Sequence, residues 1–421
     1  HTRYWRDWSS DVCSSDLTGR NPVVMVMNVS SQGVALFGRM RVFAGPVRVP
    51  SMQAVAASAP GGDVRATRRV LGCVPAPSGL GFGAGGSVGF DGPRLPGDWH
   101  GILLGVRRSA EWLAAQGAAG AMIAVYKEGG AVWPSESTHR SPRWSGTAPD
   151  GVDDSAGRDV LDVVCRMYGR EGLRLVPALS FDAPLPALEA MVARHEGLAD
   201  ASTGIAVVGA DGRARRLPGR AGAIHYNVLD PRVQQAVESL VGELCDRIRQ
   251  AGAVDGVAIL LGHDGWLHLP GVEWGLDDVT FARFAMEAGV ESPSGEGRHA
   301  KRAALVSGRL REPWLAWRAR ELASFYGRLA TLVARDAPRR SLYVAPTTLL
   351  AEGELAARFR PTLGEASEAA ADLWREIGVD PASLVRDRRI VFVSPHVHEG
   401  VASLIDRGTV ERANRSSSLA A

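Results

Sequence analysis

Apolar residues form two different patterns along this chain, a helical repeat and a short continuous run, and both are clearest between residues 224 and 278. From residue 231 to 248 the apolar side chains recur about every three or four positions, which predicts an amphipathic helix with one buried face. Asp230 is a favourable N-cap for this helix, and Pro231 suits its first turn. Residues 257–261 then form a short, uninterrupted apolar run, typical of a strand that is covered on both faces in a parallel sheet. The predicted helical stripe consists of Val233, Val237, Leu240, Val241, Leu244 and Ile248.

The same succession of helical and strand-like segments recurs through most of the chain, which indicates βα units around a parallel sheet. With a further strand near residue 70, the pattern favours an α/β fold of the TIM-type (β/α)8 barrel class, incomplete at its C-terminal end, over an open doubly wound sheet. The other predicted pairs are helix 100–116 with strand 121–126, helix 158–170 with strand 173–181, helix 312–334 with strand 342–345, and helix 365–377 with strand 390–394.

Three segments interrupt this pattern. Residues 21–65 contain a short apolar run followed by Gly and Pro residues, which predicts a small accessory β segment. Within residues 205–217, the pair Asp211 and Gly212 separates two short runs and predicts a β-hairpin. Residues 79–90 are rich in glycine, but no helix opens directly after them, so a flexible loop is favoured over a phosphate-binding loop.

The beginning of the chain looks foreign to the fold. Residues 6–17, RDWSSDVCSSDL, match the translation of a common sequencing adapter, and the first residue is His1. We therefore expect residues 1–20 to be a leader of artefactual origin. The expected organisation is this leader, the accessory segment of residues 21–65, and a barrel domain of residues 66–421 that lacks its last units. Localisation stays open, because a true N-terminus is not visible.

The composition, with 45% hydrophobic and 22% charged residues, is that of a globular protein. The formal charge of +2 and the absence of a basic block argue against a nucleic-acid partner. No apolar run approaches the roughly 18 residues that a membrane span needs. The cysteines lie far apart without a CxxC pair, so neither a zinc site nor a disulfide framework is predicted, and Cys165 and Cys245 are expected to be buried in helices. No cofactor is indicated.

Candidate chemistry gathers in the loop after the strand 257–261. In α/β barrels the loops that follow the strands carry the catalytic residues. This loop is rich in carboxylates, imidazoles and indoles, and we interpret it as part of an active-site rim. Its polar and aromatic residues are His263, Asp264, Trp266, His268, Glu273, Trp274, Asp277 and Asp278.

Asp264 and Glu273 are the best catalytic pair in this loop. Hydrolysis of a glycosidic bond uses one protonated carboxyl group and one ionised carboxylate. Asp264 lies closest to the end of the strand, although an Asp-Gly turn explains it without function. The apolar neighbours of Glu273 favour its protonated form, which suits a general acid, and the alternative is a surface loop residue. Asp277 is expected to contact substrate or to cap a following helix.

Other residues are weaker candidates for contacts with a substrate. Trp266 and Trp274 can stack on sugar rings, and core packing is the competing interpretation. His263 lies beside Asp264. Three more residues are candidates because they lie at or after predicted strand ends: Tyr126, Glu136 and Asp182.

A second polar cluster, SPHVHEG, follows the last predicted strand. His396 and His398 form a His-x-His pair that can bind a metal from one face of an extended segment, so a metal-dependent hydrolase is an alternative. His396 and Glu399 can also contact a sugar, or belong to a polar loop. No second cluster with ligand spacing accompanies them, and no metal site is assigned.

Several segments resemble the family 10-like glycosylhydrolases of bacterial, planctomycete type. They are YNVLDPRVQQAV, VDGVAILL with HDGW after it, PGVEWGLDD and PWLAWRARELASFY. The resemblance extends from Gly97 to about Pro395 and implies a (β/α)8 barrel that hydrolyses a poly- or oligosaccharide. Where many relatives have an acidic residue directly after this strand, the present chain has Gly262, His263 and Asp264. A non-catalytic carbohydrate-binding barrel is the third alternative, and it differs from the enzyme by lacking the second carboxylate.

Overall fold

The computed structural model describes residues 71–74, 99–115, 118–138, 159–194, 203–217, 222–347, 349, 355, 358 and 370–393. The chain divides into two compact units, residues 1–68 with 397–407 and residues 69–396 with 408–421. All described residues belong to the second unit. The expected leader, the accessory segment and the glycine-rich loop lie outside the described residues, and the domain boundaries stay predictions.

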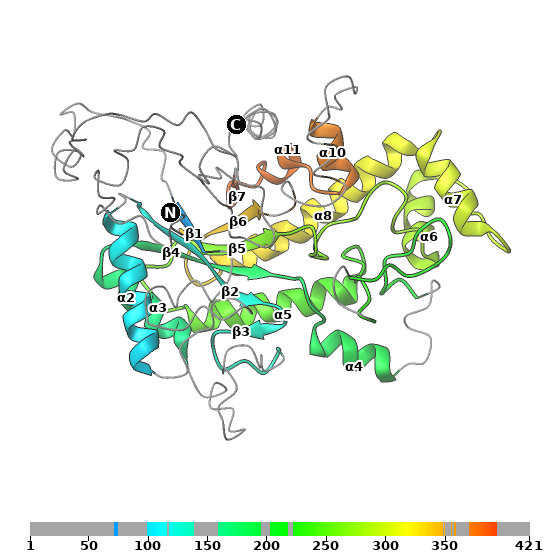
Figure 1. Cartoon of the computed structure of the whole chain (residues 1–421). Coiled ribbons are helices and arrows are strands. Elements are labelled where there is room, and N and C mark those ends of the chain that lie inside the picture. Colours follow the sequence, from blue (N-terminus) through cyan, green and yellow to red (C-terminus); the bar gives the residue numbers. More distant parts are fainter. Residues whose placement is uncertain are drawn as a thin grey trace, which may run out of the picture. The chain divides into compact units, whose positions relative to one another are not determined.

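A parallel sheet forms the centre of the described unit (Figure 1). Its six parallel strands are neighbours in the order in which they occur along the chain, and a seventh, β3 (Gly130–Ala131), pairs antiparallel with the end of β2. This sequential order is that of a barrel wall. The parallel strands are β1 (Leu71–Val74), β2 (Gly120–Lys127), β4 (Arg174–Ser180), β5 (Gly256–Leu261), β6 (Ser341–Pro346) and β7 (Ile390–Phe392).

The two faces of the sheet pack differently. One face joins the helices in a large hydrophobic core. The other face forms a separate cluster, whose buried members in the described chain all come from strands. A doubly wound sheet would bury helices against both faces, so the sheet is the curled wall of an incomplete (β/α) barrel. The members of the inner cluster are Met122, Ala124, Val176, Ala178, Ala258, Leu260 and Ala345.

The predicted helices form close to their expected positions. In α5 (Pro231–Arg247) the Asp230 side chain accepts a hydrogen bond from the Arg232 amide, and Pro231 occupies the first turn. The apolar stripe of α5 is buried, and Cys165 and Cys245 are buried as expected. The other helices are α2 (Trp99–Ala115), α3 (Val160–Arg170), α4 (Pro186–Arg194), α6 (Asp278–Ala288), α7 (Arg298–Ser307), α8 (Arg311–Ala334), α10 (Ala370–Glu376) and α11 (Pro381–Leu384).

The predicted hairpin is present between α4 and α5. Val208 pairs antiparallel with Ala214 around the turn at Asp211 and Gly212, where Gly212 has a φ of 73°. A third extended segment, which includes Tyr226, pairs antiparallel with this hairpin. The described residues 205–217 and 222–226 form an antiparallel insertion, and its Val208 carbonyl accepts hydrogen bonds from the Gly275 and Leu276 amides of the segment before α6.

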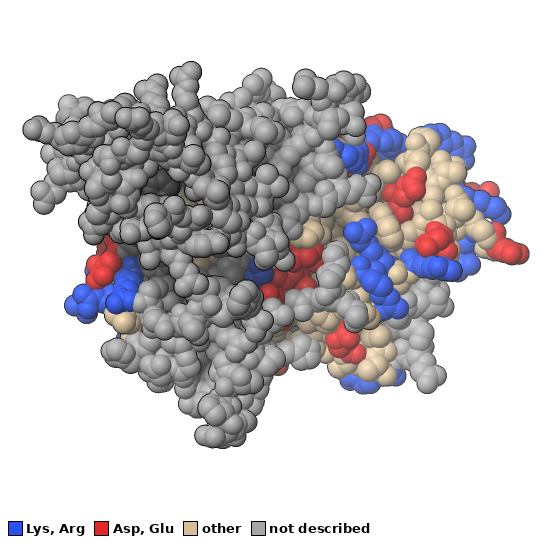
Figure 2. Space-filling view, in the orientation of Figure 1, with Lys and Arg blue, Asp and Glu red and all other residues tan. Residues whose placement is uncertain are grey.

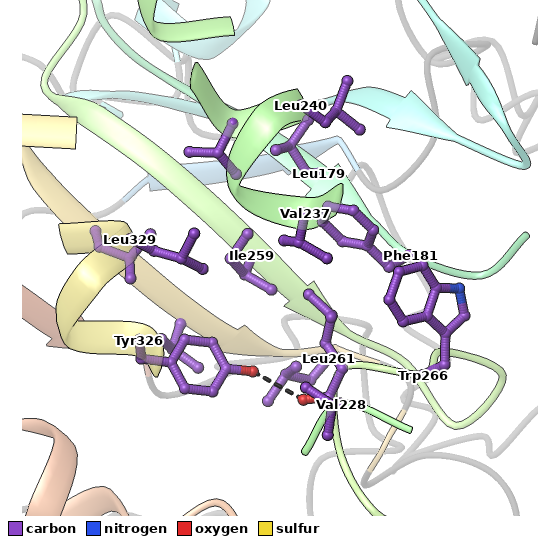
Figure 3. Close-up of a cluster of buried hydrophobic side chains, with 14 of the residues drawn as sticks. Leu179, Phe181, Val228, Val237, Leu240, Ile259, Leu261, Trp266, Tyr326 and Leu329 are labelled. Carbon is purple, nitrogen blue, oxygen red and sulfur yellow. Dashed lines mark hydrogen bonds between the residues drawn. The ribbon is translucent and has the colours of Figure 1, made fainter. Parts of the chain in front are cut away.

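The helix-facing core continues up to the loop after β5 (Figure 3). The Tyr326 hydroxyl of α8 donates a hydrogen bond to the Leu267 carbonyl at 3.0 Å. The loop therefore rests on the core instead of projecting away from it. The side chains labelled in this region are Leu179, Phe181, Val228, Val237, Leu240, Ile259, Leu261, Trp266, Tyr326 and Leu329.

Charges of both signs are mixed on the surface around α6 and α7 (Figure 2). Asp278 at the start of α6 pairs with Arg298 at 2.8 Å and with Arg302 at 2.6 Å. These guanidinium groups lower the pKa of Asp278 to about 2. In the part of the chain that the structure describes, no helix is long and apolar enough to span a bilayer.

Candidate active site

The carboxyl end of β4 carries a buried carboxylate. Leu179 and Phe181 belong to the helix-facing core, while Val176 and Ala178 belong to the inner cluster. Asp182 follows β4 by two residues and is buried. The structure therefore places Asp182, a rim candidate from the sequence, at the carboxyl edge of the sheet, in contact with the turn after β2.

Asp182 holds the turn that follows β2. Its Oδ1 accepts a hydrogen bond from the Glu128 amide at 2.7 Å, and its Oδ2 accepts one from the Ser180 hydroxyl at 3.4 Å. Glu128 and Gly129 form a tight two-residue turn between β2 and β3, with φ values of 54° and 84°. Such left-handed backbone is common for glycine and strained for glutamate. The half-buried Glu128 is thus fixed at the same edge of the sheet as Asp182.

Asp264 follows the neighbouring strand β5. It lies half-buried in a turn that the Gly265 amide closes by donating to the Gly262 carbonyl at 3.1 Å. The Trp266 amide donates to the Phe181 carbonyl at 3.0 Å, which ties this turn to the end of β4. The Asp-Gly turn expected from the sequence is confirmed, and it lies at the strand edge that carries Asp182.

Trp266 belongs to the core. Its side chain is completely buried, and its indole N–H donates to the Ala183 carbonyl at 3.0 Å. The ring packs edge-on against Phe181 and Tyr226, with centroids 5.2 and 5.1 Å away. The prediction that Trp266 stacks on a sugar is therefore wrong, and the core-packing alternative is confirmed.

Tyr126 is also a core residue. The pairing of β2 with β4 shifts between Ala124 and Tyr126, so that Tyr126 lies opposite Leu179. This irregularity turns the tyrosine to the helix-facing side, where its ring lies 5.5 Å from that of Phe181. Since Tyr126 is fully buried there, the predicted contact with substrate is wrong for this residue.

Glu273 and Trp274 lie among the helices. The loop that contains them is held to α8 by Trp314, whose indole N–H donates to the Val272 carbonyl at 2.9 Å. Glu273 is exposed, and its carboxylate accepts a hydrogen bond from the Ser307 hydroxyl of α7 at 2.8 Å. These contacts place Glu273 beside α7 and α8, and no described contact joins it to Asp264.

Trp274 is half-buried against the antiparallel insertion. The Arg215 guanidinium lies 5.1 Å from the centre of its ring, within the range of a cation–π contact. A Cβ atom at Gly209 would come within 3.0 Å of the same ring. Arg215 and Gly209 therefore occupy part of the Trp274 ring surface that was expected to stack on a sugar.

Asp277 is a helix cap. Its Oδ1 accepts a hydrogen bond from the Thr280 amide at 2.8 Å, and its Oδ2 accepts one from Asn227 at 3.1 Å. Burial raises the pKa of Asp277 to about 7, and nearby Asp230 raises it further, while the bonds with Thr280 oppose the shift. The capping interpretation is confirmed. Direct contact between Asp277 and substrate is wrong, because the side chain is completely buried.

Glu136 is exposed in the segment after β3. The neighbouring Ser135 donates to Glu243 of α5 at 3.1 Å, which places this segment beside the helix layer. His263 is half-buried next to Asp264. Among the described residues, no group of three or more His, Cys, Asp or Glu side chains is arranged to hold a metal. Three residues of the second polar cluster, His396, His398 and Glu399, lie outside the described residues, and their roles stay predictions.

The structure also draws attention to Glu128, which the sequence did not single out, and to His268, which was named only as part of the loop. Glu128 and Gly129 are the two central residues of the turn in the sequence Lys-Glu-Gly-Gly, and glycine at the second of these positions is typical of a tight hairpin, so the turn was detectable. His268 is buried below Asp264, and its Nε2 lies 2.9 Å from the Gly262 carbonyl oxygen. No sequence signal separates a buried histidine of this kind from a rim histidine such as His263.

No protein-family model matches the chain, and no curated protein matches it in sequence. Solved structures with a similar arrangement include the glycoside hydrolase domain of PgaB (BpsB) from Bordetella bronchiseptica, with a TM-score of 0.48 and 13% identity over 76% of this chain and 78% of that chain. The catalytic domain of β-amylase from Paenibacillus polymyxa gives a TM-score of 0.45 and 9% identity, over 76% of this chain and 81% of that chain. A β-galactosidase from Marinomonas ef1 gives 0.36 and 13%, over 63% of this chain and 41% of that chain. These neighbours are glycoside hydrolases.

Proposed function

We propose that this chain is a glycoside hydrolase that cleaves a poly- or oligosaccharide with Asp264 as its general acid. The observation that carries the proposal is the position of Asp264 in a closed turn, one residue beyond His263 at the carboxyl edge of a curled parallel sheet. In barrels of this class that edge is where catalytic side chains converge. A half-buried carboxyl group is accessible to a substrate and partly shielded from water, which suits proton transfer to a leaving oxygen.

Glu128 is the second carboxylate of the proposed site. It follows β2, which is separated from β5 only by β4. Neighbouring strands are about 4.8 Å apart, so the backbones of β2 and β5 lie roughly 10 Å from each other. The two carboxyl groups of a glycosidase are about 5 to 9.5 Å apart, a separation that side chains reaching inward from these two strands can provide. Glu273 is less suited, because it is exposed and bonded to Ser307 on the helix layer.

Asp182 lies between the strands that carry the proposed pair. It is buried and accepts hydrogen bonds from the Glu128 amide and the Ser180 hydroxyl. Its role in the proposal is to fix the turn that presents Glu128. Substrate contact is assigned to the half-buried residues Asp264, Glu128 and His263.

The test compares phenyl and 2,4-dinitrophenyl glycosides of the same sugar, over a panel of sugars, with release of reducing ends from polysaccharides as a second assay. A phenolate leaves slowly unless it is protonated, whereas dinitrophenolate leaves without an acid. Asp264→Asn should lower turnover of the phenyl glycoside by at least about a hundredfold and affect the dinitrophenyl glycoside much less. Glu128→Gln should lower both by at least about a hundredfold, because the ionised carboxylate acts on either substrate.

Glu273→Gln is the matched control and should keep turnover within about threefold of the wild type. Turnover near that of the wild type in Asp264→Asn would overturn the assignment of the acid. A large loss in Glu273→Gln, with Glu128→Gln unaffected, would restore the pair Asp264 and Glu273. Binding of a polysaccharide without any turnover by the wild-type chain would favour the carbohydrate-binding barrel.

A further inference from the structure

We propose that His268 is a positioning residue that sets the orientation of the Asp264 turn. The inference rests on the proposed function, because Asp264 is the proposed acid. It goes beyond that function in assigning a buried imidazole to the support of the site.

The proposal starts from one carbonyl oxygen. Gly262 is the first residue after β5, and its carbonyl oxygen lies 2.9 Å from His268 Nε2. The Gly265 amide donates to the same oxygen at 3.1 Å. Asp264 lies inside the turn from Gly262 to Gly265. The Gly262 carbonyl oxygen closes this turn, and both the Gly265 amide and the His268 ring contact that oxygen. Removing one donor leaves the turn with a single hydrogen bond across its base.

The second ring nitrogen constrains the imidazole further. Nδ1 of His268 lies 3.1 Å from the Leu269 carbonyl oxygen, so both ring nitrogens face acceptors. A neutral imidazole has one N–H to donate. The proposal places that proton on Nε2, where the acceptor is the Gly262 carbonyl oxygen. Burial lowers the pKa of His268, while its hydrogen bonds with the Gly262 and Leu269 carbonyls oppose this shift. The ring and the proposed acid are linked through the turn.

His268 is supported from the antiparallel insertion. His225 of the insertion is buried, and its Nε2 lies 3.4 Å from the His268 carbonyl oxygen. The two rings are 6.4 Å apart and nearly perpendicular. Burial lowers the pKa of both histidines, and Arg215 from the same insertion lowers both further. His225 thus contacts the backbone of His268, and the His268 ring contacts the Gly262 carbonyl of the turn.

The experiment uses two substitutions of His268 in the full chain. The amide of His268→Gln can donate to Gly262 as Nε2 does, whereas His268→Leu fills similar space without a donor. Misplacement of an acid slows the step that needs it, so His268→Leu should lower kcat for the phenyl glycoside by about 10 to 100-fold with KM within about twofold. Turnover of the dinitrophenyl glycoside should stay within about threefold, because that leaving group needs no acid. His268→Gln should restore most of kcat.

Hydrogen exchange of the Gly265 amide provides a measurement without substrate. His268→Leu should accelerate this exchange, and His268→Gln should leave it close to that of the wild type. His299→Leu is the matched control, because His299 is a buried imidazole at the start of α7 whose ring lies against Gly212 of the hairpin. It should change neither kcat nor the exchange of Gly265.

The outcomes separate the two proposals. If the wild-type chain cleaves no glycoside, the proposed function fails, and the exchange of Gly265 still tests the support by His268. Wild-type exchange in His268→Leu would overturn the positioning role. Equal losses of kcat in His268→Gln and His268→Leu, or equal losses on both glycosides, would also overturn it, since they would indicate disturbed packing alone.

Discussion

At the residue scale, the buried carboxyl group of Asp277 at a helix end makes the stability of the protein depend on pH. Asp277 caps α6 and lies near Asp230, which caps α5. A Cβ atom at Gly204 would lie 3.1 Å from Asp230 Oδ2 and 3.2 Å from Asp277 Oδ1, so both carboxylates approach the same point. Two acids in one buried place cannot both ionise easily. The fold therefore favours a proton on Asp277.

The first expectation follows from the sign of this shift. The pKa of Asp277 rises from 3.8 to about 7 in the folded chain, so the folded state holds a proton that the unfolded state has lost. The contribution of this group to stability is present below about pH 4 and is lost as the pH rises to about 7. Asp277→Asn cannot titrate, and its free energy of unfolding should change less between these pH values than that of the wild type. Urea unfolding at several pH values measures this difference, and identical pH slopes would contradict the assignment.

Glu128 gives a second expectation at the residue scale. Its φ of 54° favours asparagine or glycine over glutamate. Glu128→Asn retains the amide that donates to Asp182 and should raise the free energy of unfolding by about 0.5 to 1 kcal/mol. The same variant should lose at least about a hundredfold in turnover, because the proposed carboxylate is gone.

Urea unfolding and glycoside turnover test the two halves of this expectation. Gly129→Ala is the control for the turn, since its φ of 84° is unsuitable for alanine and the substitution should destabilise the chain. A Glu128→Asn variant that is stabilised and fully active would show that the strained turn has no catalytic residue.

The sequence predicted some of these residues and misplaced others for identifiable reasons. Asp230 and Asp277 were recognisable as caps, because a cap depends only on the residues that directly follow it. Trp266 was not recognisable as a core residue, because a loop has no periodicity that tells inward from outward positions. Its burial depends on Phe181 and Tyr226, which lie far away in sequence.

At the scale of elements, a buried arginine of α8 connects the loop after β5 with α10. Arg318 donates to the carbonyl oxygens of Gly271 at 2.7 Å and Glu376 at 2.7 Å, and it lies over the Trp314 ring. Burial lowers the pKa of Arg318 to about 9, with Glu376 opposing the shift, so the guanidinium stays charged at neutral pH. One side chain therefore satisfies backbone acceptors from two segments.

The third expectation is that Arg318→Leu lowers the free energy of unfolding by about 2 to 4 kcal/mol, because buried carbonyl oxygens lose their donors. Arg320→Leu on the same helix is the matched control. Arg320 is exposed and pairs with Glu287, and exposed pairs contribute about 0 to 1 kcal/mol. Chemical unfolding of both variants provides the comparison, and equal losses would remove the special role of the buried arginine.

Most elements could be predicted because their apolar patterns are local. The predicted helix 312–334 corresponds to α8, and the strand 257–261 to β5. Helix α7 was not predicted, and it begins at Gly297 without a side-chain cap, so the usual start signal is absent. The irregular pairing at Ala124 and Tyr126 was also invisible, because residues 121–125 of β2 are all apolar and show no alternation from which a change of face can be read.

At the scale of the whole described unit, the separation of the two cores supports the curled sheet. Inner positions of β2, β4 and β5 are small where they face each other, as at Ala124, Ala178 and Ala258, which pair in register. The helix-facing positions carry the larger side chains that meet α5 and α8. The sequence predicted the barrel from the order of its units. It did not predict the choice of catalytic partner, because that choice depends on which loops meet at one edge.

The last expectation separates carboxylate chemistry from the metal-dependent alternative. Proton transfer by Asp264 and a second carboxylate requires no metal, so dialysis against EDTA and 1,10-phenanthroline should leave turnover of the phenyl glycoside unchanged. His398→Ala, which removes one member of the His-x-His pair, should keep turnover within about threefold, while Asp264→Asn lowers it by at least about a hundredfold. A metal-dependent hydrolase would behave in the opposite way, since its metal generates the nucleophile. Loss of turnover on chelation, with recovery on adding Zn²⁺, would therefore move the chemistry from the edge at β5 to the histidine cluster after β7.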